Sequence, residues 1–525
     1  MKYHSINAIK TKKRKIFILL TLFVFFSSAC IDTYNDAASN NALISKLILT
    51  PEEYASIAYD NPKELSENEI IDIINDFQFL ESQIWNKPIT KSSDKSKVSN
   101  IKKYYLAYNN DLAKHNTTRS ANSSKFDIPI YEVELSKDNS QKDFAIICGD
   151  ERAPKILFYA NDYNISLDKS NIEMKYLMEV AKQSSLADIE LIENLKSTKR
   201  DSTLNKISKE LNIPLEQITN DFIKTKIKIN EDILTREYNP IGGITTPPAR
   251  IMSMVSPISN IAWHQDEPYN NQMPTGIISI GGWPSEGRYP VGCANIAIAT
   301  LLSILQPAMV GETASGRQIL IDWDYITSSR SLNYLSPAKM LEMAGSLLRG
   351  IYNRTKSEPQ FIDVKTFDED NNPYYVKAVM ETSTTTLNML DYIKIWATYS
   401  GGTNTKFNPN IVMQSLQNQK PVLLFGNGHF INDNHQPINE PPYNITPGHG
   451  WLIDGYCITK KTGQASNDLY WSVNMGWGKG ASCIYFKAQN NFQDCDIAFN
   501  YNGIYNVNIA YYTQEQCMIY NVEKK

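Results

Sequence analysis

Residues 289–302 read Tyr-Pro-Val-Gly-Cys-Ala-Asn-Ile-Ala-Ile-Ala-Thr-Leu-Leu. Cys293 directly follows a glycine and opens an apolar run that predicts a buried helix ending near Pro307. A thiol at a helix N-terminus faces unpaired backbone N–H groups and the positive end of the helix dipole, which favour the thiolate. Cys293 is therefore a candidate nucleophile. The alternative is a small apolar residue in a core helix, since free cysteine is among the most buried residue types.

A candidate base for this thiol lies in the C-terminal part of the chain. Residues 448–456 read GHGWLIDGY and place His449 between two glycines at the mouth of an apolar strand. Residues 471–478 read WSVNMGWG and place Asn474 at the end of the next strand, with Trp477 close behind. In a hairpin, Asn474 would orient the imidazole of His449 and Trp477 would shield it from water. Cysteine, histidine and asparagine in this order are the arrangement for an activated thiolate.

The chain has six histidines, and His429 in Gly-Asn-Gly-His-Phe is the competitor for the role of base. We favour His449 because a strand continues after it and an asparagine-bearing strand follows. Gln265, in the tripeptide Trp-His-Gln, suits an oxyanion hole, where its amide and the backbone N–H of Cys293 would donate to the developing charge. Such a tripeptide alone is weak support.

Composition limits the classes of partner. The 525 residues are 42% hydrophobic and 21% charged, a globular balance. The net charge of −4, without a basic arm, argues against nucleic acid as a partner. The seven cysteines include no CxxC pair and no Cys/His cluster at zinc spacing, so neither a metal nor a cofactor is expected.

The first thirty residues predict export. A basic segment at 12–15 precedes an apolar segment at 16–26 that is too short to span a bilayer, followed by Ser-Ser-Ala and then Cys30. This pattern resembles the lipobox of bacterial lipoproteins, in which the cysteine is lipidated and becomes the mature N-terminus. The alternative is an ordinary secretory signal cleaved after Ala29. With lipidation, the protein would be anchored at the cell envelope, on the outer membrane or the cell surface, unless the mature form is released.

The N-terminal half of the chain divides into three expected segments after the signal peptide (residues 1–29). Residues 30–125 hold a polar tether, two helices opened by capping-box patterns at 50–53 and 66–69, and a connector from 86 to 125. Residues 126–237 have an α+β pattern, with an antiparallel meander and helices. Its expected strands are 130–135, 144–148 and 156–159, and its expected helices are 171–183 and others between 187 and 229. Residues 238–250, rich in proline and glycine, predict a linker that proteases can cut.

Residues 251–525 predict a helix-rich lobe that carries Cys293, followed by a β-rich lobe. Further helices are expected at 337–352, 388–398 and 409–418. Strands are expected at 422–425, 451–453, 470–473 and 484–486.

Four motifs in this order resemble the streptopain family of cysteine peptidases. They are WHQDEPYN at 263–270, Gly-Cys at 292–293, GHGWLIDG at 448–455 and VNMGWG at 473–478. Residues 144–154, FAIICGDERAP, also resemble a strand–turn of that family's propeptide. The resemblance implies an α+β fold: a papain-like two-lobe peptidase domain, with a helical lobe and an antiparallel β lobe, preceded by an α+β propeptide domain.

The resemblance also implies roles for individual residues. Cys293 would be the nucleophile, His449 the general base and acid, and Gln265 the oxyanion donor, while Asn474 and Trp477 would support the histidine. The protein would be a secreted zymogen that hydrolyses peptide bonds in proteins or peptides. Its own propeptide would inhibit it until cleavage in or near residues 238–250.

Two departures from the family pattern leave an alternative open. Met475 stands where the family usually has tryptophan, and an Asn-rich segment at 489–502 replaces a glycine-rich C-terminal loop. These differences would suit a catalytically impaired, surface-displayed binding lipoprotein that keeps the fold. A third hypothesis is a Cys-His acyl transferase of the transglutaminase kind.

Overall fold

The computed structural model describes residues 47–84, 96–107, 127–136, 142–161, 163, 172–229, 250–280, 283–431, 448–460, 467–478, 484–487, 496–501 and 505–525. The predicted signal peptide, Cys30 and all but the last residue of the predicted linker lie outside these ranges. We call residues 47–229 the N-terminal half and residues 250–525 the C-terminal half. Within the described ranges, no helix combines the length and apolar character needed to cross a bilayer.

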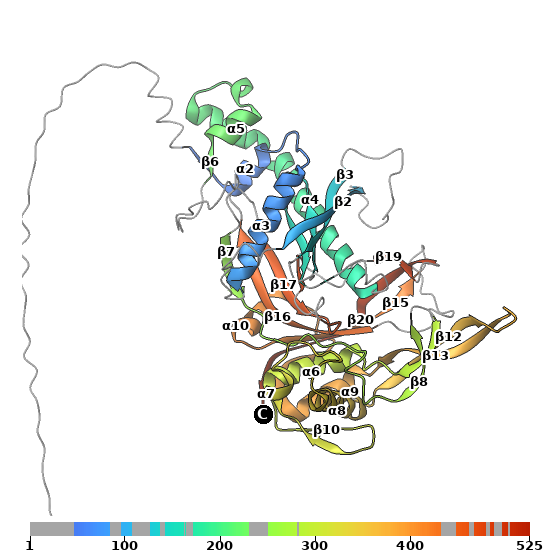
Figure 1. The fold of residues 1–525 in the computed structure, drawn as a ribbon. Coiled ribbons are helices and arrows are strands. Elements are labelled where there is room, and N and C mark those ends of the chain that lie inside the picture. The colour runs from blue at the N-terminus through green and yellow to red at the C-terminus, as the bar shows by residue number, and fades with distance from the viewer. Residues whose placement is uncertain are drawn as a thin grey trace, which may run out of the picture.

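The N-terminal half packs helices against an antiparallel meander (Figure 1). Its helices are α2 (Pro51–Ile57), α3 (Glu67–Ile84), α4 (Ile172–Leu211), the 3-10 turn η2 (Leu215–Gln217) and α5 (Asn220–Lys226). Its strands are β1 (Ile48–Leu49), β2 (Lys97–Ala107), β3 (Asp127–Ser136), β4 (Lys142–Cys148), β5 (Lys155–Ala160) and β6 (Lys228–Ile229). Both capping boxes form, between Thr50 and Glu53 and between Ser66 and Glu69. The meander β3–β4–β5 is also confirmed.

Two features of this half were not expected. Part of the expected connector is strand β2, which pairs along its length with β3. The strand is fixed by contacts from distant elements, because Lys103 and Tyr105 both bond to Glu64. The several helices expected between 171 and 229 are largely one helix, α4. It runs through Ser184 and Ser185, whose hydroxyls donate to carbonyls three residues earlier.

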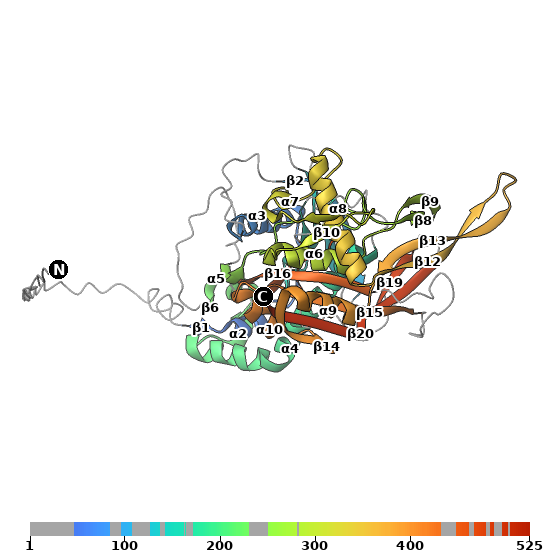
Figure 2. The ribbon, with the colours of Figure 1, turned by 90° about the horizontal axis from the view of Figure 1, so that it is seen from below.

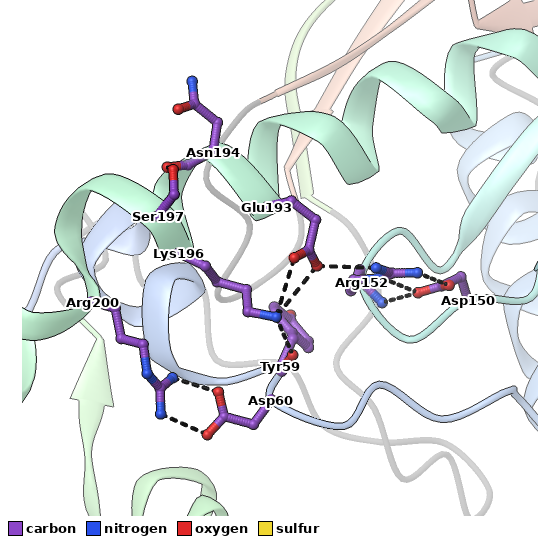
Figure 3. Close-up of polar contacts among 9 residues, drawn as sticks. All are labelled: Tyr59, Asp60, Asp150, Arg152, Glu193, Asn194, Lys196, Ser197 and Arg200. Carbon is purple, nitrogen blue, oxygen red and sulfur yellow. Dashed lines mark hydrogen bonds and ion pairs between the residues drawn. The ribbon is translucent and has the colours of Figure 1, made fainter. Parts of the chain in front are cut away.

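A polar network joins the first helices of this half to α4 (Figure 3). Arg152 donates to both oxygens of Asp150 at 2.9 and 2.6 Å and to Glu193 of α4 at 3.0 Å. Lys196 of α4 donates to the carbonyl of Tyr59 at 3.2 Å. Arg200, one turn further along α4, forms a two-pronged ion pair with Asp60. Residues 47–84 therefore pack as part of the same unit as α4 and the meander.

The C-terminal half contains the helices α6 (Cys293–Leu305), α7 (Trp323–Ile326), α8 (Ala338–Arg354), α9 (Thr386–Trp396) and α10 (Pro409–Gln417). Four of these five helices, α6 to α9, share one apolar core, whereas α10 packs into the cluster that contains Trp471. Leu301 of α6, Leu347 of α8 and Ile393 of α9 are fully buried in the shared core. The helix expected at 337–352 forms as α8, and its Met340, Met343, Leu347 and Leu348 are buried in this core.

The strands of the C-terminal half form a large sheet and two small ones. The large sheet contains β7 (Arg250–Val255), β14 (Ala397–Thr403), β15 (Val422–Ile431), β16 (Gly448–Lys460), β17 (Asp468–Asn474), β18 (Ile484–Lys487), β19 (Asp496–Tyr501) and β20 (Tyr505–Lys524). A four-stranded sheet has the order β12 (Glu358–Phe367), β13 (Pro373–Ser383), β8 (Thr275–Ile280) and β9 (Trp283–Arg288). Strands β10 (Val310–Glu312) and β11 (Gln318–Leu320) form a hairpin. The α+β class is confirmed.

The large sheet continues from one half of the chain into the other. Strand β18 pairs antiparallel with β5, so the path runs β14-β20-β15-β16-β17-β18-β5-β4-β3-β2. Ile146 and Leu157 of the N-terminal half belong to the same buried cluster as Trp471 and Met475 of the C-terminal half. The two halves therefore share both a sheet and a core.

Candidate active site

Helix α6 begins at Cys293, as the sequence predicts. Gly292 precedes it with φ of +94°, where a side chain is strained, and a Cβ there would lie 2.7 Å from the carbonyl oxygen of Thr382. The carbonyl of Gly292 accepts the backbone N–H groups of Asn295 and Ile296. Only glycine fits at this position, which delivers the half-buried thiol of Cys293 to the start of the helix.

The first turn of α6 is held by buried polar contacts. Asn295 donates to the carbonyl of Val291 at 2.8 Å and to the hydroxyl of Ser357 at 2.9 Å, and it accepts from Thr355 at 3.0 Å. The hydroxyl of Thr382 donates to the carbonyl of Pro290 at 2.6 Å. The segment around Cys293 is therefore fixed from both sides.

The first residues of β16 lie directly against this helix start. The Sγ of Cys293 is 3.8 Å from the carbonyl oxygen of Gly448. A Cβ on Gly450 would lie 3.1 Å from the Cα of Ala294 and 2.7 Å from the ring of Phe425. The residues on either side of His449 thus touch the two residues that begin α6. The backbone on either side of His449 therefore lies at the candidate nucleophile, and the pairing of the thiol with the imidazole stays a prediction.

The imidazole of His449 lies in an apolar enclosure. Its Nε2 is 3.2 Å from the carbonyl oxygen of Met475. The ring of Trp477 has its centroid 4.6 Å from that of His449, and the ring of Trp451 lies nearly parallel at 6.0 Å. The side chain is 4% exposed. Burial lowers the pKa of His449 to about 3, against the opposing effect of the Met475 carbonyl, so the ring is neutral in this state.

Asn474 bonds to groups other than the imidazole in this structure, and its role in orienting His449 stays a prediction. Its amide donates to the carbonyl of Ile261 at 2.9 Å, and its oxygen accepts from the N–H of Gly476 at 3.1 Å. In the pairing of β16 with β17, Asn474 lies opposite Leu452, three residues beyond His449 on β16. Trp477 follows after the end of β17, and its ring packs against that of His449.

Gln265 lies in a segment tied to both sides of the site. Its carbonyl accepts the N–H of Val291, two residues before Cys293, at 3.0 Å. The carbonyl of Trp263 accepts the N–H of Gly478, next to Trp477, at 3.1 Å. Gln265 is half-buried. This position is compatible with the role of oxyanion donor, which stays a prediction.

A buried carboxyl group supports the same segment, and sequence reasoning assigned it no role. Asp454 of β16 accepts from the hydroxyl of Ser472 at 2.9 Å and from the N–H of Ser259 at 3.3 Å. Burial raises the pKa of Asp454 to about 7. Together with the Asn474–Ile261 bond, these contacts fasten residues 259–261, just before Gln265, to the hairpin that carries His449. An aspartate inside the apolar run WLIDG was the available signal.

The competing histidine and the other described thiols have different surroundings. His429 lies on β15, paired with Ala510 of β20, three residues beyond the position that pairs with His449. Cys148, Cys457 and Cys517 are buried, and burial raises the pKa of each to about 12, so they stay protonated. The described cysteines form no disulfide. Nor do the described residues contain a group of three potential ligands that could hold a metal ion.

Comparison with known proteins agrees with this arrangement. The family model described as the Peptidase C10 family matches residues 263–486, from the Trp-His-Gln segment through the motifs around Cys293, His449 and Trp477. This region is therefore similar to the cysteine peptidases of the C10 family. The resemblance to the streptopain family is thereby confirmed over these residues.

A solved structure shares similarity with the chain, whereas curated proteins do not. A fragment of prointerpain A from Prevotella intermedia has a similar structure, with a TM-score of 0.39 and 17% sequence identity. The alignment covers 75% of this chain and 96% of that one. No curated protein matches the chain.

Proposed function

We propose that the chain is an exported cysteine endopeptidase made as a zymogen, with Cys293 as its nucleophile. The observation that carries the proposal is the contact of the Cys293 thiol, at the start of α6, with the backbone beside His449. A nucleophile and a base on two rigid elements are the arrangement needed for covalent catalysis.

The proposed chemistry uses these groups as follows. His449 takes the proton of Cys293, and the thiolate attacks the carbonyl carbon of the scissile bond. The amide of Gln265 and the backbone N–H of Cys293 donate to the oxyanion that develops. His449 then protonates the leaving amine, and water attacks the thioester. Trp477 and Trp451 keep the imidazole out of bulk water.

The state of His449 in the uncleaved chain supports a zymogen. A neutral, deeply buried imidazole does not readily form the imidazolium that the thiolate needs as its partner. Activation would therefore include a change around His449. Met475, whose carbonyl faces its ring, shares a buried cluster with residues of the N-terminal half. We propose that the N-terminal half holds this resting state.

A buried ion cluster joins the N-terminal half to the peptidase region. The ammonium of Lys155, on β5, lies 2.5 Å from Asp468 of β17 and 3.3 Å from Asp188 of α4. All three side chains are at least nine-tenths buried. The hydroxyl of Tyr470 donates to the carbonyl of Ile156 at 3.0 Å. A propeptide held by such contacts would stay in place until the chain is cut, and residues 238–250 are the proposed place of cutting.

Export and anchoring are a separate part of the proposal, based on the sequence of residues 1–30. We propose a lipid anchor on Cys30 and a location at the bacterial cell envelope. Palmitate labelling and membrane fractionation of the wild type beside Cys30→Ser test this. Equal labelling and fractionation of the two proteins would refute the anchor and leave the peptidase proposal untouched.

The main test compares the intact mass and N-terminal sequence of purified wild type with those of Cys293→Ala. The wild type should shorten to a new N-terminus in or near 238–250 and hydrolyse a fluorogenic peptide, while Cys293→Ala should do neither. Cys457→Ala, which removes a buried thiol outside the site, is the matched control and should behave as wild type. Processing and hydrolysis by Cys293→Ala would refute the assignment. Failure of an epoxide inhibitor to label Cys293 in processed protein would favour the binding lipoprotein.

A further inference from the structure

The hairpin β12–β13 projects from the body of the protein. It stands clear of the other elements in both views (Figures 1 and 2). Strand β12 pairs only with β13 within the described sheet, so it is an edge strand. Its ten residues span about 30 Å at the usual rise per residue.

One face of this sheet carries four large exposed aromatic side chains. Residues that alternate along a strand, and residues paired across strands, share a face. Phe361 and Phe367 of β12 share a face with Tyr375, which pairs with Lys365. Phe361 pairs with Val379, Val379 with Ile278, and Ile278 lies on the face of Trp283, which pairs with Ile280. The exposed fractions are 50% for Phe361, 44% for Phe367, 68% for Tyr375 and 59% for Trp283. We call these four residues the aromatic strip.

The strip begins at the candidate nucleophile. The ring of Tyr289, four residues before Cys293, meets the ring of Phe361 edge-on, with centroids 6.4 Å apart. At the base of the hairpin, Thr382 bonds to Pro290 and touches the position of Gly292. The sheet that carries the strip is therefore fixed to the residues that precede Cys293 at the start of α6.

The charged residues around the aromatic strip favour an extended polypeptide over a lipid bilayer as its binding partner. Asp363 and Lys377 pair across the strands on the same face, and the ammonium of Lys365 lies 5.6 Å from the ring centroid of Phe367. A lipid bilayer would have to bury these charges, and the acidic tip Asp368-Glu369-Asp370 would be repelled by anionic lipid. An extended polypeptide can place apolar side chains on the rings and polar groups on the charges between them.

We propose that the aromatic strip binds an extended segment of a protein substrate, remote from the bond that is cut. This inference rests on the proposed peptidase function and specifies its substrate class: unfolded or extended polypeptides long enough to reach from Cys293 along the hairpin. A substrate of about six residues, roughly 20 Å long, is too short to use much of the strip.

The test replaces Phe361, Phe367 and Tyr375 together with serine in the full-length chain, matured to constant mass. The matched control replaces Leu320, Leu387 and Ile395, which are exposed apolar residues outside the strip, with serine. Unchanged thermal unfolding shows that both variants fold. With labelled, denatured casein, the strip variant should lose at least about tenfold in kcat/KM, the loss typical of truncating interface aromatics. With a six-residue fluorogenic peptide, kcat/KM should stay unchanged, and the control should match wild type on both.

A binding measurement separates failure of this inference from failure of the proposed function. In a Cys293→Ala background, the strip substitutions should weaken the binding of labelled denatured casein by a similar factor, measured by fluorescence anisotropy. Equal kcat/KM on casein, or equal losses on casein and the short peptide, would overturn the inference. The inference would also be overturned if the strip substitutions abolished dimer formation or vesicle binding while casein binding persisted. No hydrolysis of either substrate by wild type would instead refute the proposed function.

Discussion

Replacing His449 with glutamine should change the way in which the free energy of unfolding depends on pH. The comparison uses the full-length chain in a Cys293→Ala background, so that no self-cleavage intervenes. Glutamine keeps an N–H donor for the carbonyl of Met475 but does not titrate. The two proteins then differ chiefly in the buried imidazole.

The magnitude follows from the environment of the ring. The pKa of His449 is about 3 in the folded chain, against an ordinary value of 6.5. As the pH falls below the ordinary value, the unfolded chain binds a proton that the folded chain does not, so stability is lost down to the folded pKa. Between about pH 7 and pH 5 this linkage amounts to about 2 kcal/mol. The His449→Gln variant should lack this loss.

The assay is urea unfolding followed by tryptophan fluorescence at about pH 7 and pH 5. Asp454, whose raised pKa gives a pH dependence of opposite sign, is present in both proteins and cancels in the difference. An NMR titration of the His449 ring nitrogens gives a direct reading, and the ring should stay neutral to about pH 4. Parallel pH dependence of the two proteins, or a ring that titrates near its ordinary pKa, would refute the reasoning.

Three further substitutions test other parts of the structure. Gly292→Ala should lower the rate of peptide hydrolysis at least about tenfold, because it displaces the start of α6. Gly316→Ala is the control and should leave the rate unchanged, since Gly316 also has a positive φ but has open space around its Cβ. Steady-state kinetics of the two variants measures the difference. Lys155→Met removes the cation from beside buried carboxylates and should lower the free energy of unfolding in urea by about 3 kcal/mol. Adding Asp468→Leu to this variant should restore part of the lost stability. If the double variant instead loses the sum of the two single losses, the prediction is contradicted. Wild type should lose about 1.4 kcal/mol of stability per pH unit between about pH 4 and pH 7 relative to Asp454→Asn, because the unfolded chain ionises Asp454 in this range while the folded chain keeps it protonated. The difference should level off above about pH 7, and equal slopes of the two proteins between about pH 4 and pH 7 would contradict this.

Local signals in the sequence predicted the elements that carry the site. The glycine before Cys293 and the apolar run after it predicted α6 with its N-terminus at the thiol. The capping boxes at Thr50 and Ser66 predicted the starts of α2 and α3. These features depend on neighbours within a few residues, so the sequence contains the whole of their cause.

Features set by register or by distant partners were not predictable in the same way. The sequence suggested that Asn474 lies near His449 in a hairpin, but it gave no sign of the bonds that Asn474 makes to Ile261 and Gly476 or of the position of Trp477 beside the histidine ring. The hairpin β12–β13 and the sheet that joins β18 to β5 were not foreseen either. Their strands are short or charged, and pairing with other segments stabilises them.

The outer edge of strand β5 stays unpaired until most of the chain has been synthesised. Lys155 on β5 and its partner Asp468 are separated by 313 positions, and β18 lies further still. During synthesis the N-terminal half therefore emerges with an unpaired sheet edge, the kind of surface on which chains aggregate or exchange strands. Closing so long a loop also slows folding, because its entropy is lost before the sheet is complete. A chaperone that covers β5 until β18 arrives would raise the yield of folded protein more than one that acts only on the C-terminal half.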